Sequence, residues 1–350
     1  MEPAKENGNN MMTKLLKLTG LLAVVAVIII VVGYFTLPPD YESLAFPGGK
    51  SFAFTICDDT DLSTVDNVKP MYDLLHQLGL RTTKTVWVLP TNDTTNWANR
   101  GETLSDSAYA AFVLELKAKG FEIGYHGSRG GNSRRDETIQ ALSQFRDLLG
   151  EYPRVYVNHS MNAENLYWGA DKLSIWPIRT LYELYMDDED FFGNDPESEY
   201  FWGDIAAEHL DYVVSFSFFE TNMAKVNPYM PYHDPEKPYV KYWFHTAEGR
   251  DMEAFNELLS PTNLDRLEQE GGVCIVYTHL AYGFVKDGMV DSVTQVRLRD
   301  LASRNGWFVP TSEILDYLRS QPPDGEKLPY RQRLYLELRW MWEKLWHGSS

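Results

Sequence analysis

Three short segments of this sequence combine acidic and histidine side chains that could perform acid–base or metal chemistry. Asp58 and Asp59 are adjacent, and His126 and His279 each follow an apolar run that ends in tyrosine or threonine. Carboxylates and imidazoles transfer protons in hydrolytic reactions, and both bind divalent ions such as Zn²⁺. The residue types therefore indicate a hydrolytic or metal-binding site, provided that the fold brings the three segments together.

Each of these segments stands at the end of a predicted β-strand. The predicted strands are Ser51–Cys57, Thr83–Val88, Phe121–Tyr125, Val155–Val157, Tyr212–Phe216, Val273–Tyr277 and Trp307–Val309. Helical patterns such as Ser105–Lys119 and Glu137–Leu149 lie between them, and this alternation is typical of an α/β fold. About seven strands can form a closed barrel or an open doubly wound sheet. In both, the carboxyl ends of the strands meet on one face, so we expect the candidate residues to share a pocket.

The order and spacing of these motifs resemble those of the polysaccharide deacetylase family of carbohydrate esterases. The resemblance covers residues 48–320 and implies a distorted (β/α) barrel. It implies that Asp58 is the general base, that Asp59 and His126 bind a divalent metal ion such as Zn²⁺, and that His279 is the general acid. The implied reaction is the removal of acetyl groups from an acetylated polysaccharide or oligosaccharide.

The sequence departs from this family at the third metal ligand. A second histidine is expected four residues after His126, where this chain has Gly130. His159, at the end of the next predicted strand, is our substitute ligand, and Asp61 and Asn132 are weaker candidates. The family's Arg-x-Pro-Tyr motif is also absent from that strand end. Substrate contacts are expected from Arg129, Asn132 and Asn158, and sugar stacking from some of Trp87, Trp97, Tyr167, Trp168 and Trp202.

These departures leave two other functions open. The first is a degenerate, non-catalytic protein that binds a glycan or helps to assemble the cell envelope. The second is a glycosidase on a related barrel, with Asp58 or Asp59 and another carboxylate as its acid/base pair. A nucleic-acid partner is disfavoured, because the formal net charge is −18 and phosphate recognition needs a basic surface.

The N-terminal region predicts a membrane anchor. No residue from Leu18 to Leu37 is charged, and such a run is long enough to cross roughly 30 Å of hydrocarbon as a helix. Lys14 and Lys17 precede the run and Asp40 follows it, so the positive-inside rule places the N-terminus in the cytoplasm. We expect a cytoplasmic tail at 1–12, a transmembrane helix at 13–37 and an extracytoplasmic catalytic domain. A cleaved signal peptide is the alternative, although its apolar region is usually about 7–15 residues long.

Two further segments flank the expected domain. Residues 38–47 contain prolines and form a linker, and residues 321–350 begin with a second Pro-containing linker. Beyond it, Leu334, Leu338, Met341, Trp342 and Leu345 recur at helical spacing among basic residues. This amphipathic helix suits either a membrane interface or packing on the domain, and the sequence favours neither.

Overall fold

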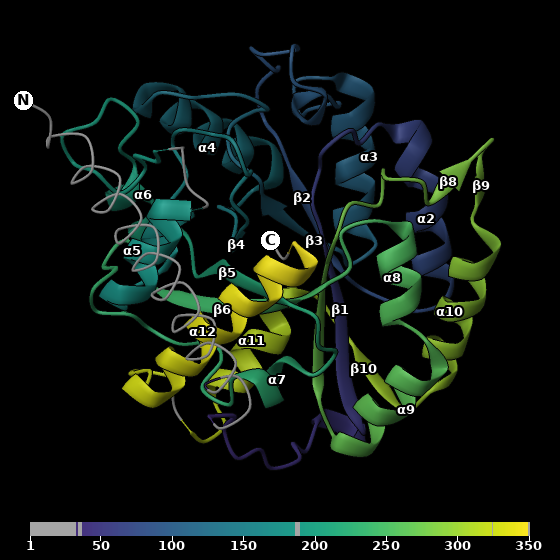
Figure 1. The fold of residues 1–350 in the computed structure, drawn as a ribbon. Coiled ribbons are helices and arrows are strands. Elements are labelled where there is room, and N and C mark those ends of the chain that lie inside the picture. Colours follow the sequence, from purple (N-terminus) through teal and green to yellow (C-terminus); the bar gives the residue numbers. More distant parts are fainter. Residues whose placement is uncertain (1–32, 34–36, 186–189, 324, 349–350) are drawn as a thin grey trace, which may run out of the picture.

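The computed structural model describes residues 33, 37–185, 190–323 and 325–348. Seven parallel strands form a closed barrel (Figure 1). They are β1 (Phe52–Asp58), β2 (Thr83–Val86), β3 (Glu122–Tyr125), β4 (Val155–Tyr156), β5 (Tyr212–Phe218), β6 (Tyr242–Glu248) and β7 (Val273–Thr278). The barrel closes because β1 pairs with β7 as well as with β2. This pairing excludes the open doubly wound sheet that the sequence left possible.

The predicted strand count agrees with the structure, but one member differs. Strand β6 was not predicted, and the predicted strand at Trp307–Val309 is instead β10 (Gly306–Phe308). It pairs only with the start of β1, at Phe52–Phe54, whereas β2 pairs with the end of β1. A short hairpin of β8 (Val285–Lys286) and β9 (Met289–Val290) lies outside the barrel.

Helices cover the outside of the barrel. They are α2 (Val65–Gln77), α3 (Ser107–Ala118), α4 (Arg135–Leu149), α5 (Trp176–Tyr185), α6 (Gly203–His209), α7 (Met223–Val226), α8 (Met252–Leu258), α9 (Pro261–Glu270), α10 (Ser292–Ser303), α11 (Thr311–Arg319) and α12 (Tyr330–His347). Three short 3₁₀ helices are η1 (Pro47–Gly49), η2 (Trp97–Asn99) and η3 (Gly169–Lys172). Helix α2 begins with a capping box in which Thr64 and Asn67 satisfy each other's backbone amides.

The strand register brings the candidate residues to one rim. Asp58 is paired with Thr278 of β7, so Asp59 and His279 follow at the same level. Val86 is paired with Tyr125 of β3, which brings His126 to the rim two strands away from β1. Every residue of β1 is buried, as expected for the strand that closes the barrel.

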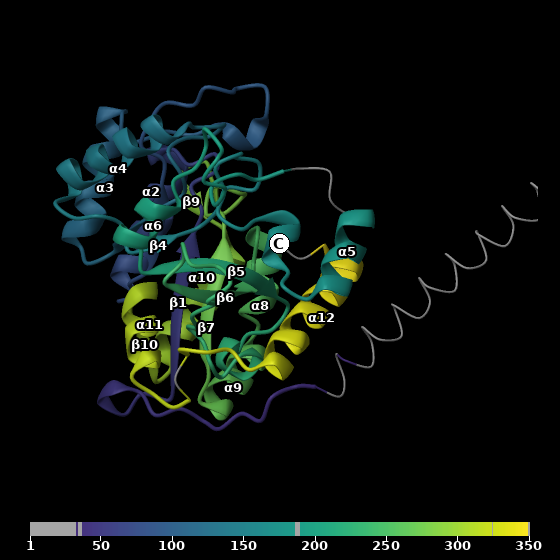
Figure 2. The same cartoon turned by 90° about the vertical axis from the view of Figure 1, so that its left-hand side faces the viewer.

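The C-terminal helix packs on the domain. In α12, the ring of Trp340 lies 5.1 Å from that of Phe216 on β5, and Glu343 accepts a hydrogen bond from the Phe219 amide. Figures 1 and 2 both show α5 beside α12, where Tyr182 and Trp340 are in contact. Of the two roles left open by the sequence, the structure shows packing.

The predicted anchor at 13–37 lies outside the described residues, apart from Gly33 and Leu37. Within the part of the chain that the structure describes, no helix has both the length and the apolar character needed to cross a bilayer.

Candidate functional site

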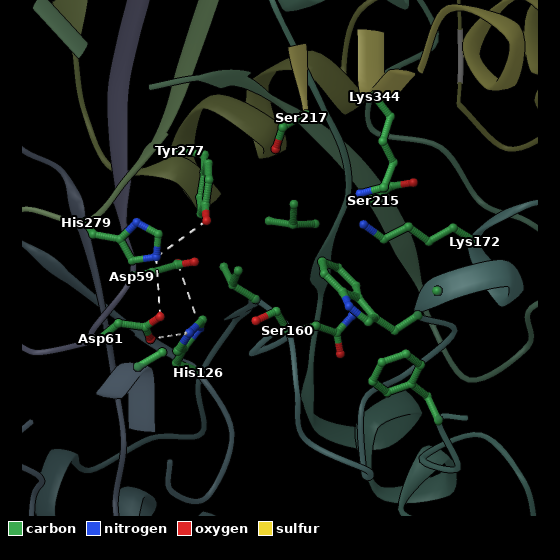
Figure 3. Close-up of a pocket in the computed structure, with 18 of the residues that line it drawn as sticks. Asp59, Asp61, His126, Ser160, Lys172, Ser215, Ser217, Tyr277, His279 and Lys344 are labelled. Carbon is green, nitrogen blue, oxygen red and sulfur yellow. Dashed lines mark hydrogen bonds and ion pairs between the residues drawn. The ribbon is translucent and has the colours of Figure 1, made fainter. Parts of the chain in front are cut away.

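A pocket of about 490 Å³ opens at the carboxyl-terminal rim of the barrel (Figure 3). The loops after β1, β3 and β7 contribute Asp59, Asp61, His126 and His279 to one side of it. This volume lies within the range of roughly 300–1,000 Å³ that is usual for small-molecule sites. The expectation that the strand-end motifs share a pocket therefore holds for Asp59, His126 and His279.

Asp61 is the centre of this group. Its Oδ1 lies 3.1 Å from His126 Nε2 and 3.6 Å from His159 Nε2. Its Oδ2 lies 3.4 Å from His279 Nε2 and accepts a hydrogen bond from the Tyr282 hydroxyl. Burial opposes ionisation of the Asp61 carboxyl, but the three histidines outweigh it and hold its pKa well below the usual range.

The donor atoms fit a divalent metal ion. Ligand atoms of Asp61, His126 and His159 all lie within 4.8 Å of one another. Tetrahedral ligands about 2.1 Å from an ion are separated from each other by about 3.4 Å, and the two Asp61–histidine distances lie on either side of this value. The His159 Nδ1 lies 3.1 Å from Asn162 Oδ1, which leaves Nε2 to act as a ligand.

Three buried atoms beside this centre lack any hydrogen-bond partner among the described residues: Asp59 Oδ1, His126 Nδ1 and His159 Nε2. Leaving a polar atom buried and unpaired is costly, and a bound cation would remove that cost for a ligand nitrogen or oxygen. These three residues are the predicted ligand set. Asp59 Oδ1 lies 3.8 Å from His126 Nδ1, so Asp61 offers the nearer carboxylate. The assignment of Asp59 as a ligand stays a prediction.

The structure explains why the expected second histidine is absent. A Cβ atom at Gly130 would lie 2.3 Å from the backbone oxygen of Asn99, so no side chain fits there. His159 reaches the same centre from the loop after β4, and its ring centroid is 5.3 Å from that of His126. A histidine from a different strand end thus occupies the space near His126.

Trp87 positions both histidines. Its indole N–H donates a hydrogen bond to the backbone oxygen of His126, and its ring stacks on the His126 ring and meets the His159 ring edge-on. Trp87 is fully buried, as is Trp202, so neither can stack on a sugar. Trp97 and Trp168, also named as stacking candidates, line the pocket.

Asp58, the predicted general base, is not among the residues that line the pocket. Side chains alternate along a strand, so Asp58 and Asp59 point in opposite directions. Asp58 is fully buried, 2.9 Å from the Lys84 ammonium, and accepts hydrogen bonds from the Tyr72 hydroxyl and the Leu280 amide. The structure does not bring this carboxylate to the other candidates; Asp59 is the residue of the pair that faces the pocket.

His279 is placed to donate a proton into the pocket. Its Nδ1 lies 2.8 Å from the backbone oxygen of Arg250, and its Nε2 lies 3.4 Å from both Asp61 Oδ2 and the Tyr277 hydroxyl. Burial alone would lower the pKa of His279, but the Asp61 and Asp59 carboxylates raise it to about 9. The two carboxylates therefore favour the protonated form of the imidazole.

The three predicted substrate contacts have structural partners. The Arg129 guanidinium lies 2.9 Å from Glu137, and Asn132 Oδ1 accepts a hydrogen bond from the Ala163 amide; neither residue lines the pocket. Asn158 does line it, but its side chain bonds both backbone groups of Leu166. Substrate binding by these residues stays a prediction.

No sequence pattern indicated the opposite side of the pocket. Lys172 of η3 and Trp340 and Lys344 of α12 line it, and their approach to the strand ends depends on long-range packing. Only Trp168, beside η3, was named beforehand, and that was on residue type alone.

No protein-family model and no curated protein matches this sequence. Solved structures that are similar include a provisionally assigned polysaccharide deacetylase from Mycobacterium smegmatis, with 11% identity over 83% of this chain and 98% of that chain, and a TM-score of 0.49. PuuE allantoinase is 13% identical over 83% of this chain and 97% of that chain, with a TM-score of 0.49. A chitin deacetylase from Colletotrichum lindemuthianum is 17% identical over 79% of this chain and 90% of that chain, with a TM-score of 0.37. These similarities are distant.

Proposed function

We propose that this chain is a metal-dependent hydrolase that removes acetyl groups from a glycan. The observation that supports this most directly is the cluster of Asp61, His126 and His159 donor atoms beside the Asp59 carboxyl and the His279 imidazole, which both line the pocket. Such a cluster supplies the parts that metal-assisted hydrolysis needs, namely a cation site, a base and an acid. The sequence resemblance to polysaccharide deacetylases points to the same reaction.

Asp61, His126 and His159 would hold the ion, and carboxylate and imidazole donors suit Zn²⁺. A divalent ion there supplies a Lewis acid for the acetyl carbonyl oxygen. Asp59 faces the pocket and would take the proton from the attacking water. His279 Nε2 then donates a proton to the departing amine or alcohol.

We also propose that the apolar segment at 13–37 anchors the protein in the cytoplasmic membrane, with the domain outside. Support comes from the uncharged run between Leu18 and Leu37 and from Lys14 and Lys17 before it. Digestion of intact cells with an external protease tests this: loss of the domain supports the proposal, and full protection contradicts it.

Metal content tests the cation site. We expect about one divalent ion per full-length chain by elemental analysis, and loss of that ion in His159→Ala. His209→Ala is a matched control, because His209 stacks on Tyr152 at the surface, away from the pocket. An ion that is retained in His159→Ala would exclude this residue from the ligand set.

Acetate release from acetylated oligosaccharides tests the reaction. Removal of a general acid or base typically costs about 10²–10⁴-fold in rate, so Asp59→Asn and His279→Gln should each show a loss of that size with the metal retained. Metal binding and glycan binding without acetate release would favour the non-catalytic alternative. New reducing ends instead of acetate would indicate a glycosidase.

A further inference from the structure

The pocket has a second charged side. Lys172 and Lys344 line it across from Asp59 and His279, as Figure 3 shows. The whole chain has a formal net charge of −18, so two lysines directed into its candidate active-site pocket are not explained by its general composition. The proposed reaction uses neither of them.

Lys172 is a buried lysine that contacts aromatic rings. The residue is only 6% exposed. Its Nζ lies 3.3 Å from the centre of the Trp168 ring and 5.4 Å from the centre of the Trp340 ring. Within the described residues, its ammonium group has no hydrogen bond and no ion pair. Burial, and then the positive charge of Lys344, lower its pKa well below the usual value for lysine.

The charges around Lys172 do not neutralise it. Lys237 adds a further positive charge, and Glu248 is the carboxylate that favours the charged form of Lys172. Glu248 Oε1, however, lies 3.6 Å from the Arg250 guanidinium. Two of these three neighbouring charges are positive, so they would favour a negative ligand.

The position of Lys172 is fixed by packing of the C-terminal helix. Lys237 donates a hydrogen bond to the backbone oxygen of Lys172. Glu337 of α12 accepts hydrogen bonds from the amides of Ser174 and Ile175, just beyond η3. This lysine is thus held in place before any ligand arrives, which reduces the entropy lost on binding.

We propose that Lys172 binds an anionic group of the substrate, so that the glycan carries a carboxylate or a phosphate near the acetylated sugar. This inference rests on the proposed function and names its substrate class. An anion in the pocket would pair with Lys172 and stabilise its ammonium form, whereas a neutral glycan would offer no counter-charge. A lysine, as a compact point charge with three donors, suits a single carboxylate or phosphate oxygen. Trp168, already against the ammonium, offers an aromatic face to the sugar ring.

Three acetylated tetrasaccharides of equal length test the inference on the full-length, metal-loaded protein: a neutral one, one with a carboxylated sugar and one with a phosphorylated sugar. We expect kcat/KM for one of the anionic substrates to exceed that for the neutral one by about tenfold or more, the effect of one hydrogen bond to a charged group. This ratio should fall towards one in Lys172→Met, and Lys172→Arg, which keeps the charge, should retain part of it. Lys286→Met, an exposed lysine on β8, should leave the ratio unchanged.

The inference would be overturned if kcat/KM were the same for the anionic and neutral substrates in the wild type. It would also be overturned if Lys172→Met kept the wild-type preference for an anionic substrate. The wild type also tests it without any variant, because added salt should weaken only the anionic substrates. Preference for one of the two anionic arms identifies the anion. If no substrate releases acetate, the proposed function fails. The Lys172 inference is then decided by calorimetry, which compares the dissociation constants of the anionic and neutral tetrasaccharides for the wild type and Lys172→Met.

Discussion

The buried ion pair between Asp58 and Lys84 predicts that Asp58→Asn is mainly a stability variant. Both side chains are fully buried, their charged atoms are 2.9 Å apart, and the Tyr72 hydroxyl donates a hydrogen bond to the same carboxylate oxygen. The substitution leaves the Lys84 ammonium without its counter-charge in the protein interior. Removing one partner of such a pair typically costs about 3–5 kcal/mol, and we expect the free energy of unfolding to fall by that amount.

Urea unfolding of the full-length protein in mild detergent, followed by tryptophan fluorescence, measures this loss. Asp73→Asn is the control, since Asp73 forms an exposed ion pair with Lys69 at 2.8 Å, and exposed pairs contribute at most about 1 kcal/mol. Lys84→Met should lose a similar amount to Asp58→Asn, because it leaves the Asp58 carboxylate uncompensated.

The same Asp58→Asn protein decides which aspartate is the base. Our assignment of Asp59 requires that the folded fraction of Asp58→Asn still releases acetate within about tenfold of the wild type, well short of the loss of a general base. A variant that is as stable as the wild type and binds metal, but releases no acetate, would show that Asp58 is the base after all.

Three further predictions concern single contacts. Asn162→Ala removes the group that orients His159 and should weaken metal affinity about 10–100-fold in a competitive chelator titration; an unchanged affinity would contradict the donor geometry. Gly130→Ala forces a Cβ against the Asn99 backbone and should cost about 1–3 kcal/mol in urea unfolding, whereas equal stability would show that the loop can move aside. Burial lowers the pKa of His245 to about 3, so the fold favours its neutral form: the stability it contributes is complete above the unfolded pKa of 6.5 and is lost as the pH falls towards 3. Between pH 6 and 4 the wild type should lose up to about 1.4 kcal/mol per pH unit more than His245→Gln, and parallel curves for the two proteins would refute this.

Most of the barrel could be predicted because its strands are short apolar runs that end in turn residues. Strand β6 was missed because His245, Thr246 and Glu248 interrupt its apolar character, although all three are buried. Helix α2 contains Pro70, a residue type that local patterns count against a helix interior. Both elements depend on tertiary packing that local patterns do not report.

The sequence predicts which site residues stand at strand ends. It does not predict which way their side chains point. The sequence shows that Asp58 and Asp59 alternate, but not which of them faces the pocket, because that depends on how the barrel closes. Asp61 lies beyond the strand, and its central position follows from the loop conformation. Lys172 had no signal at all, since it reaches the pocket only through contacts with a helix more than 150 residues later in the chain.

The contribution of α12 to the pocket has a consequence for biosynthesis. The metal-binding side is built from the first half of the chain, up to His159, whereas the opposite side requires Trp340 and Lys344. Helix α12 is the last helix of the described chain, so the wall that carries Trp340 and Lys344 is also the last part of the pocket to be synthesised.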